Sequence, residues 1–259
     1  MSSPDRPVPL WLSVILSLLA WLTAIFFTVV LYIFSLVFVL PVSLLVDHGS
    51  RRLIDWVSKI WGKAILATSL IWKLEVRGLE NIRKDRHYVI VANHQSMLDI
   101  LVVLAGLPHH FKFIAKKEIF SIPFIGWHIA LANYIPIDRS SPESGKRAIL
   151  AARHQLERGT SVLFFPEGTR SPDGEIKAFK TGAFKIARET GTEILPLVIC
   201  GTGAAVPKHS WKIKKTSHFF LSVGKPAAVR GKNFEDLEKE KEEIRRSMIR
   251  RLAEIRRSG

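Results

Sequence analysis

The residues that could do chemistry are clearest in the segment NHQSMLD, residues 93–99, where a histidine precedes an aspartate by five positions. Positions five apart on one continuous helix diverge by about 140° and do not meet. His94 and Asp99 can meet if the histidine lies in a turn and the aspartate lies in the first turns of a helix. The carboxylate would then hold one ring nitrogen and leave the other free as a base. Taken alone, the spacing also fits an ordinary core histidine.

Two other catalytic interpretations of this segment are weaker. Ser96 lies two residues after His94 and suggests a Ser-His-Asp triad. However, no Gly-x-Ser-x-Gly turn surrounds Ser96, and the histidine of such a triad normally lies far away in sequence. The nine histidines form no His-Glu-x-x-His motif and the single cysteine cannot form a pair, so we expect no metal site.

Two further segments place charged side chains where predicted strands end. AKKEIFSIPFIGW begins with Lys116 and Lys117, and a lysine at a strand end can bind a phosphate as a point charge. FPEGTRSPDG carries Glu167 and Arg170 on a backbone constrained by proline and glycine, and the planar arginine fork suits phosphate oxygens. The alternatives are solvated surface lysines and a plain Glu–Arg surface pair.

The elements that must position these residues follow from the hydrophobic pattern after residue 73. Short apolar runs alternate with helical stretches, which predicts an α/β fold with a mostly parallel sheet flanked by helices. The predicted strands are 87–92, 111–115, 133–137, 161–165, 194–200 and 218–223. The predicted helices are 97–106, 123–131, 144–158, 182–190 and 234–257, the last with an apolar seam of Ile244, Met248, Leu252 and Ile255.

The N-terminal region has a different character. No charged side chain occurs between Pro7 and Val46, and a membrane-spanning helix needs only about 20 apolar residues. A signal peptide is the alternative, but its apolar core is shorter and follows a basic start. We therefore expect a membrane-embedded helical segment that tilts, breaks near Pro41 or re-enters one leaflet.

The stretch 50–73 predicts an amphipathic helix. Arg51, Asp55, Lys59 and Lys63 recur every four residues as a polar stripe, with apolar side chains away from it. Such a helix suits the membrane interface, and five of the seven tryptophans lie in the first 72 residues. A helix packed on the globular domain is the alternative. We expect a membrane-associated region over 1–73 and an α/β domain over 74–259.

The charge distribution narrows the class of partner. The first 50 residues carry one arginine and two aspartates, so a net charge of +16 falls on residues 51–259. A basic domain behind a membrane segment suits an anionic lipid surface or anionic substrates. Nothing in the sequence resembles a module that reads nucleic acid, so no nucleic-acid partner is expected. One cysteine, Cys200, excludes internal disulfides and suits a reducing compartment.

Four segments together resemble a known family. NHQSMLD, AKKEIFSIPFIGW, FPEGTRS and ILPLVICGT occur in the order and at the intervals of the glycerophospholipid acyltransferases, over about residues 74–226. Within them the chain looks most like the bacterial 1-acyl-glycerol-3-phosphate acyltransferases, and it departs from their pattern at no key position.

The resemblance implies roles for eight residues. His94 matches the catalytic base and Asp99 the residue that orients it. The acceptor-binding residues would include Lys116, with Arg170 as a phosphate ligand. The remaining members of the acceptor-binding block are Glu167, Gly168 and Thr169, and Pro196 matches a position linked to acyl-donor binding or to packing.

The implied reaction is acyl transfer from a thioester to the sn-2 hydroxyl of lysophosphatidic acid at the cytoplasmic face of the inner membrane, without a metal or cofactor. Acyl-CoA and acyl-carrier protein are both open as donors, and neither chain length nor oligomeric state follows from the sequence. Glycerol 3-phosphate or another lysophospholipid is an alternative acceptor. A non-catalytic basic membrane-binding protein is the alternative outside the enzymes.

Overall fold

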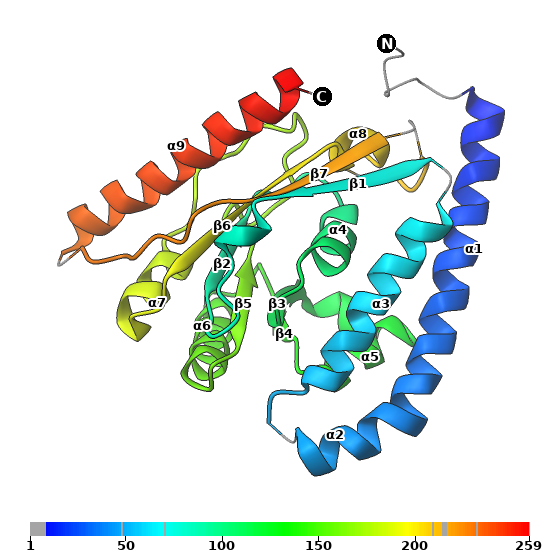
Figure 1. The fold of residues 1–259 in the computed structure, drawn as a ribbon, viewed down its shortest axis with the longest axis horizontal. Coiled ribbons are helices and arrows are strands. Elements are labelled where there is room, and N and C mark those ends of the chain that lie inside the picture. Colours follow the sequence, from blue (N-terminus) through cyan, green and yellow to red (C-terminus); the bar gives the residue numbers. More distant parts are fainter. Residues whose placement is uncertain are drawn as a thin grey trace.

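A seven-stranded sheet forms the centre of the protein in the computed structural model, which describes residues 9–47, 49–69, 71–208, 210–213, 217–231 and 233–258 (Figure 1). The strands are β1 Trp72–Arg77, β2 Val89–Ala92, β3 Phe111–Lys116, β4 Ile135–Ile137, β5 Ser161–Phe164, β6 Ile194–Cys200 and β7 Ser217–Val223. Their order across the sheet is β1-β7-β6-β2-β5-β3-β4.

Most of the strand pairs are parallel. β6, β2, β5, β3 and β4 run in one direction, whereas β7 pairs with β6 in the antiparallel sense and β1 runs parallel to β7. β2 lies in the middle of the sheet and all four of its residues are buried. The predicted α/β fold with a mostly parallel sheet is therefore confirmed, and the carboxyl end of β2 brings His94 to one edge of the sheet.

Helices cover both faces of the sheet (Figure 1). One apolar core joins the sheet to α4 (Leu98–Gly106) and α3 (Arg52–Thr68), and α1 (Leu10–Phe34) lies outside α3. The other core joins the sheet to helices on the opposite face. These are α6 Pro142–Glu157, α7 Gly182–Thr190 and α9 Phe234–Ser258.

The C-terminal helix packs as its apolar seam predicts. α9 lies against β6, and Ile244, Met248, Leu252 and Ile255 are all buried. The other predicted helices begin or end within two residues of their observed bounds, and α7 ends at Gly191 in the left-handed conformation, which glycine adopts without strain.

The first strand was missed by the sequence pattern. β1 (Trp72–Arg77) pairs with β7 along its length, so the sheet begins two residues before the expected domain boundary at 74. The segment WKLEVR alternates apolar and charged residues, which is the strand period. Trp72 completes this alternation and is 7% exposed, stacked near Phe219, so it is a core residue of the sheet.

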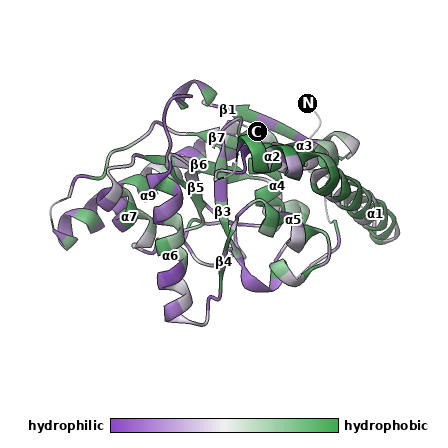
Figure 2. Cartoon of the chain, turned by 90° about the horizontal axis from the view of Figure 1, so that it is seen from below, coloured by the Kyte–Doolittle hydropathy of each residue, from purple (hydrophilic) through white to green (hydrophobic). Residues whose placement is uncertain are grey.

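The N-terminal apolar region is one long helical segment from Leu10 to Val46, long and apolar enough to cross a membrane and little buried by the rest of the chain. Figure 2 shows α1 in the colour of hydrophobic residues, at the side of the domain. The irregularity expected near Pro41 is present: a π-helical turn, η1 (Ser35–Val39), separates α1 from α2 (Leu40–Val46). Proline has no backbone N–H, so one helical hydrogen bond is missing at Pro41, and the wider π-helical turn accommodates this loss.

The middle of the polar stripe of α3, Asp55 and Lys59, faces the domain and not water, whereas Lys63 is exposed. Asp55 is 1% exposed and accepts hydrogen bonds from Tyr134 and His110, while Lys59 donates to the carbonyl of Leu107. In contrast, Trp56 on the other side of the helix is 57% exposed. The spacing predicts a polar face on the helix but not whether that face points to water or to the domain. In the structure, buried polar groups that the sequence does not reveal bind these charged side chains.

Candidate active site

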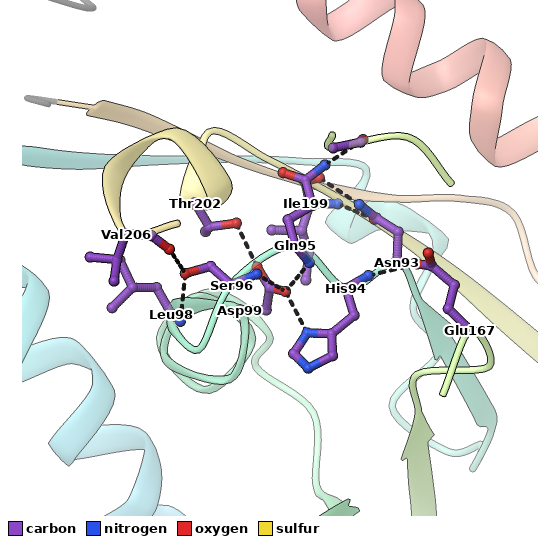
Figure 3. A network of polar contacts seen from close by, with 11 residues as sticks. Asn93, His94, Gln95, Ser96, Leu98, Asp99, Glu167, Ile199, Thr202 and Val206 are labelled. Atoms are coloured by element: carbon purple, nitrogen blue, oxygen red, sulfur yellow. Dashed lines mark hydrogen bonds and ion pairs between the residues drawn. The ribbon is translucent and has the colours of Figure 1, made fainter. Parts of the chain in front are cut away.

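His94 and Asp99 meet at the carboxyl end of β2. His94 lies in the turn after the strand, and Asp99 lies in the first turn of α4. Their contact joins His94 Nδ1 to Asp99 Oδ2 at 2.7 Å (Figure 3). The strand-turn-helix arrangement that the spacing required is therefore present.

The partners of Asp99 fix the tautomer of His94. The same Asp99 Oδ2 accepts hydrogen bonds from the amides of Gln95 at 2.6 Å and Ser96 at 3.0 Å, and Oδ1 accepts one from the Thr202 hydroxyl at 2.5 Å. A carboxylate held by backbone N–H donors acts as an acceptor, so His94 Nδ1 carries the proton. The lone pair of the neutral imidazole is then on Nε2.

The free nitrogen of His94 is accessible. Figure 3 shows the ring edge that carries Nε2 pointing away from Asp99, and the side chain of His94 is 11% exposed while that of Asp99 is fully buried. Phe165 stacks on the imidazole with ring centroids 4.1 Å apart. The apolar ring fixes the orientation of the base and limits the access of water from that side.

The neighbours of His94 in NHQSMLD hold the turn in place. Asn93 continues the sheet with its side chain, which donates to the Ile199 carbonyl at 2.9 Å and accepts from the Ile199 amide at 2.8 Å. The Ser96 hydroxyl donates to the Val206 carbonyl at 2.7 Å and is fully buried. A serine in this position is a structural residue, as the lack of a nucleophile motif indicated.

Glu167 supports the histidine from the opposite loop. Its carboxylate accepts hydrogen bonds from the amides of His94 at 2.8 Å and Lys177 at 3.1 Å. Burial raises the pKa of Glu167, and the two amide bonds oppose that shift. The sequence placed Glu167 in an acceptor-binding block, whereas its contacts in the structure join two segments of the site.

A cationic cluster lies at the same edge of the sheet. Arg170 is half-buried beside Arg139, which follows β4, and burial together with the charge of Arg170 lowers the pKa of Arg139. Lys116 ends β3 and forms an ion pair with Glu118 at 3.1 Å, largely exposed to solvent. Arg139 is exposed, and the charge of Glu118 also acts on it. Two arginines at the same end of the sheet are suited to a dianionic phosphate.

The three remaining predicted residues occupy a backbone turn, an exposed surface position and a packing position. Gly168 has φ +74°, a left-handed conformation that L side chains rarely adopt, and a side chain there would also meet Lys180. The Thr169 hydroxyl is exposed and accepts a hydrogen bond from Lys208. Pro196 is buried inside β6 opposite Val91, a packing position within the sheet.

Hydrogen bonds from α9 hold the loop that carries Glu167 and Arg170. The connection between β5 and α7 has no regular structure over residues 165–181. Arg245 donates to the carbonyls of Ile176 at 2.9 Å and Lys177 at 2.8 Å, and Arg256 donates to the Gly174 carbonyl at 2.8 Å. Because Lys177 also holds Glu167, these contacts connect α9 to the turn of His94.

Three residues of the site escaped the sequence reasoning. Arg139 lies two residues after the predicted strand 133–137, much as Lys116 follows the predicted strand 111–115, and that similar position could have indicated it. Thr202 lies just after ILPLVIC, but only the fold brings its hydroxyl to Asp99, and nothing in the sequence assigns Arg245 to the loop. Among the described residues, no group of three or more His, Cys, Asp or Glu side chains could hold a metal ion.

Comparison with known proteins agrees with this geometry. The family model described as Acyltransferase matches residues 73–200. The crystal structure of the 1-acyl-sn-glycerophosphate (LPA) acyltransferase PlsC from Thermotoga maritima superposes with a TM-score of 0.69 and 31% identity, covering 92% of this chain and 98% of that one. The chain belongs to the 1-acyl-sn-glycerol-3-phosphate acyltransferase family.

Curated relatives from plants and bacteria match over a shorter part of the chain. The chloroplastic LPAT1 of Arabidopsis thaliana is 38% identical over 187 residues, which cover 72% of this chain and 52% of the relative. The 1-acyl-sn-glycerol-3-phosphate acyltransferase of Pseudomonas aeruginosa is 36% identical over 140 residues, covering 54% of this chain and 53% of the relative. The matched part of this family member thus spans about half the length of these relatives.

Proposed function

We propose that the protein transfers a fatty acyl group from an acyl thioester to the sn-2 hydroxyl of 1-acyl-glycerol 3-phosphate, giving phosphatidic acid. The observation that carries this proposal is the open Nε2 of His94, oriented through Nδ1 by a buried carboxylate, at an edge shared with Arg139 and Arg170. A base and a phosphate-binding cluster at one edge suit an acceptor that bears both a hydroxyl and a phosphate.

His94 acts as general base in this mechanism. Nε2 takes the proton of the sn-2 hydroxyl as that oxygen attacks the thioester carbonyl, and Asp99 stabilises the imidazolium. The tetrahedral intermediate then collapses, the carbon–sulfur bond breaks, and the thiolate takes the proton from His94. No covalent acyl-enzyme, metal or cofactor is required.

The oxyanion of the tetrahedral intermediate is stabilised by donors other than the amides of His94, Gln95 and Ser96. The amides of Gln95 and Ser96 donate to Asp99, and the amide of His94 donates to Glu167. Because each of these N–H groups has a partner, none is available to a developing oxyanion. The contacts of these three amides therefore argue against their serving as oxyanion donors.

The phosphate of the acceptor binds to Arg170 and Arg139, with Lys116 at the exposed border. These side chains distinguish a phosphomonoester from a neutral headgroup because each contributes a positive charge or a fork of N–H donors. Gly168 and Thr169 shape the loop that carries Arg170, and Glu167 keeps this loop in register with His94.

The acceptor is a membrane lipid and the donor carrier is water-soluble, so we place the site at the cytoplasmic face of the inner membrane. The apolar helical segment Leu10–Val46 supports this assignment, because it is long enough to enter a bilayer. Acyl-CoA and acyl-carrier protein are both acidic and suit the basic domain.

An acceptor panel tests the proposal. Purified protein is given an acyl thioester with lysophosphatidate, glycerol 3-phosphate or lysophosphatidylcholine, and thiol release and lipid products are measured with both donor carriers. The expected result is phosphatidate from lysophosphatidate, with little turnover of the other two acceptors. Efficient turnover of lysophosphatidylcholine would contradict the phosphate assignment, and the absence of transfer to every acceptor would contradict the enzymatic function.

A further inference from the structure

The connection between β3 and α5 exposes large apolar side chains at the catalytic edge of the sheet. It consists of the 3-10 turn η3 (Lys117–Ser121) and a Pro-containing bend that leads into α5 (Ile125–Leu131). Ile119 is 36% exposed, Ile122 is 49% exposed and Trp127 is 46% exposed. In a water-soluble surface loop these side chains would be costly, because none of them gains the burial that normally offsets its ordering.

This connection is joined to the apolar N-terminal helix by aromatic contacts. Tyr32, near the end of α1, packs edge-on against Phe124 and also contacts Trp127, with ring centroids 5.7 Å apart in both pairs. Phe124 and Trp127 are themselves 5.2 Å apart. The exposed apolar side chains of the connection therefore lie beside a helix whose own apolar surface is uncovered.

A second set of contacts fixes the position of α5. His128 contacts the Ser58 hydroxyl of α3 at 2.9 Å, and Trp61 of α3 donates to the Thr28 hydroxyl of α1 at 2.9 Å. α1, α3 and α5 are thus linked in a closed set of contacts. The connection cannot turn its apolar side chains inward without breaking these links.

The backbone of Phe124 supports a specific role for this segment. Phe124 has φ +63°, an unfavourable conformation for a bulky L residue that costs of order 1–3 kcal/mol. The conformation directs its ring into the contacts with Tyr32 and Trp127. A strained residue that orders an exposed apolar surface, rather than a buried core, indicates a surface with a binding function.

Basic residues border this apolar surface. Lys116 and Lys117 lie at the start of the connection, and Arg139 lies after the neighbouring strand β4. Apolar and aromatic side chains beside lysines and arginines are typical of segments that enter the boundary of an anionic bilayer.

We propose that the connection from Ile119 to Trp127 is a second lipid-contacting element, which inserts beside α1 and forms the side of the entrance for the lysolipid acceptor. The acyl chain of the acceptor remains in the bilayer along Ile122 and Trp127, while the phosphate of the acceptor reaches Arg139 and Arg170. This inference rests on the proposed function for the identity of the acceptor, and on geometry alone for the contact with lipid.

A bilayer fits this surface better than a protein partner does. The apolar side chains are continuous with α1 through Tyr32, so whatever covers α1 at this level also covers the connection. An apolar segment of the length of Leu10–Val46 suits the hydrocarbon core of a membrane. A second copy of the chain is the competing occupant, and the test below separates the two.

The test places an environment-sensitive fluorophore at position 122. The full chain carries Ile122→Cys with Cys200→Ser, so that the label has one attachment site, and it is reconstituted in vesicles of phosphatidylcholine and phosphatidylglycerol. Nitroxide lipids with the quencher near the headgroup or near the chain end report depth, and aqueous iodide reports exposure to water. The matched control is Leu150→Cys, because Leu150 is apolar and 63% exposed but lies on α6, across the sheet from α1.

The expected result is a blue shift and strong quenching by headgroup-proximal nitroxide at position 122, with neither at position 150. Equal iodide quenching at both positions would overturn the proposal. Blue shift without nitroxide quenching, together with energy transfer between labelled chains, would assign the surface to a second copy and also overturn it.

A functional comparison separates this inference from the proposed reaction. Ile122→Asp should lower kcat/KM for lysophosphatidate in vesicles by about tenfold, since a charge replaces an apolar contact with lipid. Turnover of the same acceptor dispersed in detergent should fall less, because no insertion into a bilayer is needed there. An equal loss in both assays would contradict a lipid-contacting role. Failure of the wild-type chain to acylate lysophosphatidate would overturn the proposed function. The contact with lipid would still be tested by the fluorescence experiment.

Discussion

Two histidine–aspartate pairs lie at opposite ends of the same sheet. His94 and Asp99 meet after β2, with 2.7 Å between Nδ1 and Oδ2. His110 and Asp55 meet just before β3, beneath α3, with 3.0 Å between the same two atom types. In both pairs a nearly fully buried carboxylate holds Nδ1, so the pair itself does not distinguish a base from a structural contact.

The difference lies around the second ring nitrogen. His94 Nε2 points away from Asp99 (Figure 3), and Arg139 and Arg170 follow strands that end on the same side of the sheet. In contrast, His110 Nε2 is buried without a hydrogen-bond partner. Burial lowers the pKa of His110 even though Asp55 favours its charged form. A buried, blocked nitrogen cannot reach a substrate, so the His110 pair joins α3 to the domain while the His94 pair can do chemistry.

The surroundings of the two carboxylates differ in the same sense. Besides the ring of His94, the partners of Asp99 among the described residues are the amides of Gln95 and Ser96 and the Thr202 hydroxyl, which are all neutral donors. Asp55 instead lies near Lys112, a fully buried lysine whose Nζ atom has no hydrogen-bond partner and whose pKa burial lowers to about 8. Both carboxylate oxygens of Asp99 thus have hydrogen-bond donors, whereas the second cluster holds a buried lysine without a hydrogen-bond partner.

Replacing each aspartate by asparagine should show the largest difference between the two histidine–aspartate pairs. Asp99→Asn should lower kcat by about 10³-fold with little change in thermal stability, because the histidine loses its orienting acceptor. Asp55→Asn should leave the kcat of the folded protein within about twofold but destabilise it by about 3 kcal/mol, since a buried charge network loses its anion. Parallel thiol-release assays and thermal melts measure both effects. A large loss of kcat in Asp55→Asn at full stability would remove the distinction.

Substitution of the two arginines near His94 should have the next largest effect, on the KM for the acceptor. Arg170→Gln and Arg139→Gln should each raise KM for lysophosphatidate by roughly tenfold to thirtyfold, since each removes a charged contact to phosphate. The matched control is Arg250→Gln, an exposed arginine of α9 for which the described residues offer no ion pair. Initial rates against acceptor concentration test this. Unchanged KM in both variants would place the phosphate elsewhere.

The tether from α9 should have a smaller effect on the same edge. Arg245→Met removes two hydrogen bonds to the loop that positions Glu167, so kcat/KM should fall on the order of tenfold through misplacement of the site. Arg245→Lys should restore part of the loss, because lysine retains a charge and a donor, and the pH profile of kcat should keep its shape. An altered pH profile would indicate a direct effect on the base rather than on the loop.

Much of this arrangement followed from the sequence, and the remainder has physical reasons. The period of the hydrophobic pattern gave six of the seven strands and the apolar seam of α9, because burial on one face repeats with the geometry of the element. β1 was missed because WKLEVR continues an amphipathic stretch, and its strand period extends over six residues only.

The direction of side chains was harder to predict than their spacing. The amphipathic pattern predicts that Asp55 and Lys59 face water, yet they face a histidine and a carbonyl group from the loop before β3. Likewise Arg139 and Thr202 reach the site only through the order of the strands. Long-range pairing decides these contacts, and one sequence does not encode it in a local pattern.

Lys112 offers the smallest effect and the sharpest pH signature. Its pKa falls from 10.5 in the unfolded chain to about 8 in the folded protein, so between these values the unfolded state binds a proton that the folded state lacks. The free energy of unfolding from this group therefore rises as pH increases from about 8 to 10.5 and is constant below. Lys112→Met should lose that rise and gain about 1–2 kcal/mol at neutral pH, with kcat unchanged. Melts across this range in both proteins check it, and an identical pH dependence would contradict the buried charge.

The central claim is that the accessible nitrogen, and not the pair, makes the base. The most direct measurement compares His94→Ala with His110→Ala by thiol release from an acyl thioester in the presence of lysophosphatidate. The account predicts a loss of at least about 10³-fold for His94→Ala and a kcat within about threefold of wild type for His110→Ala, both measured on folded protein. Comparable losses in the two variants, or full activity in His94→Ala, would contradict it.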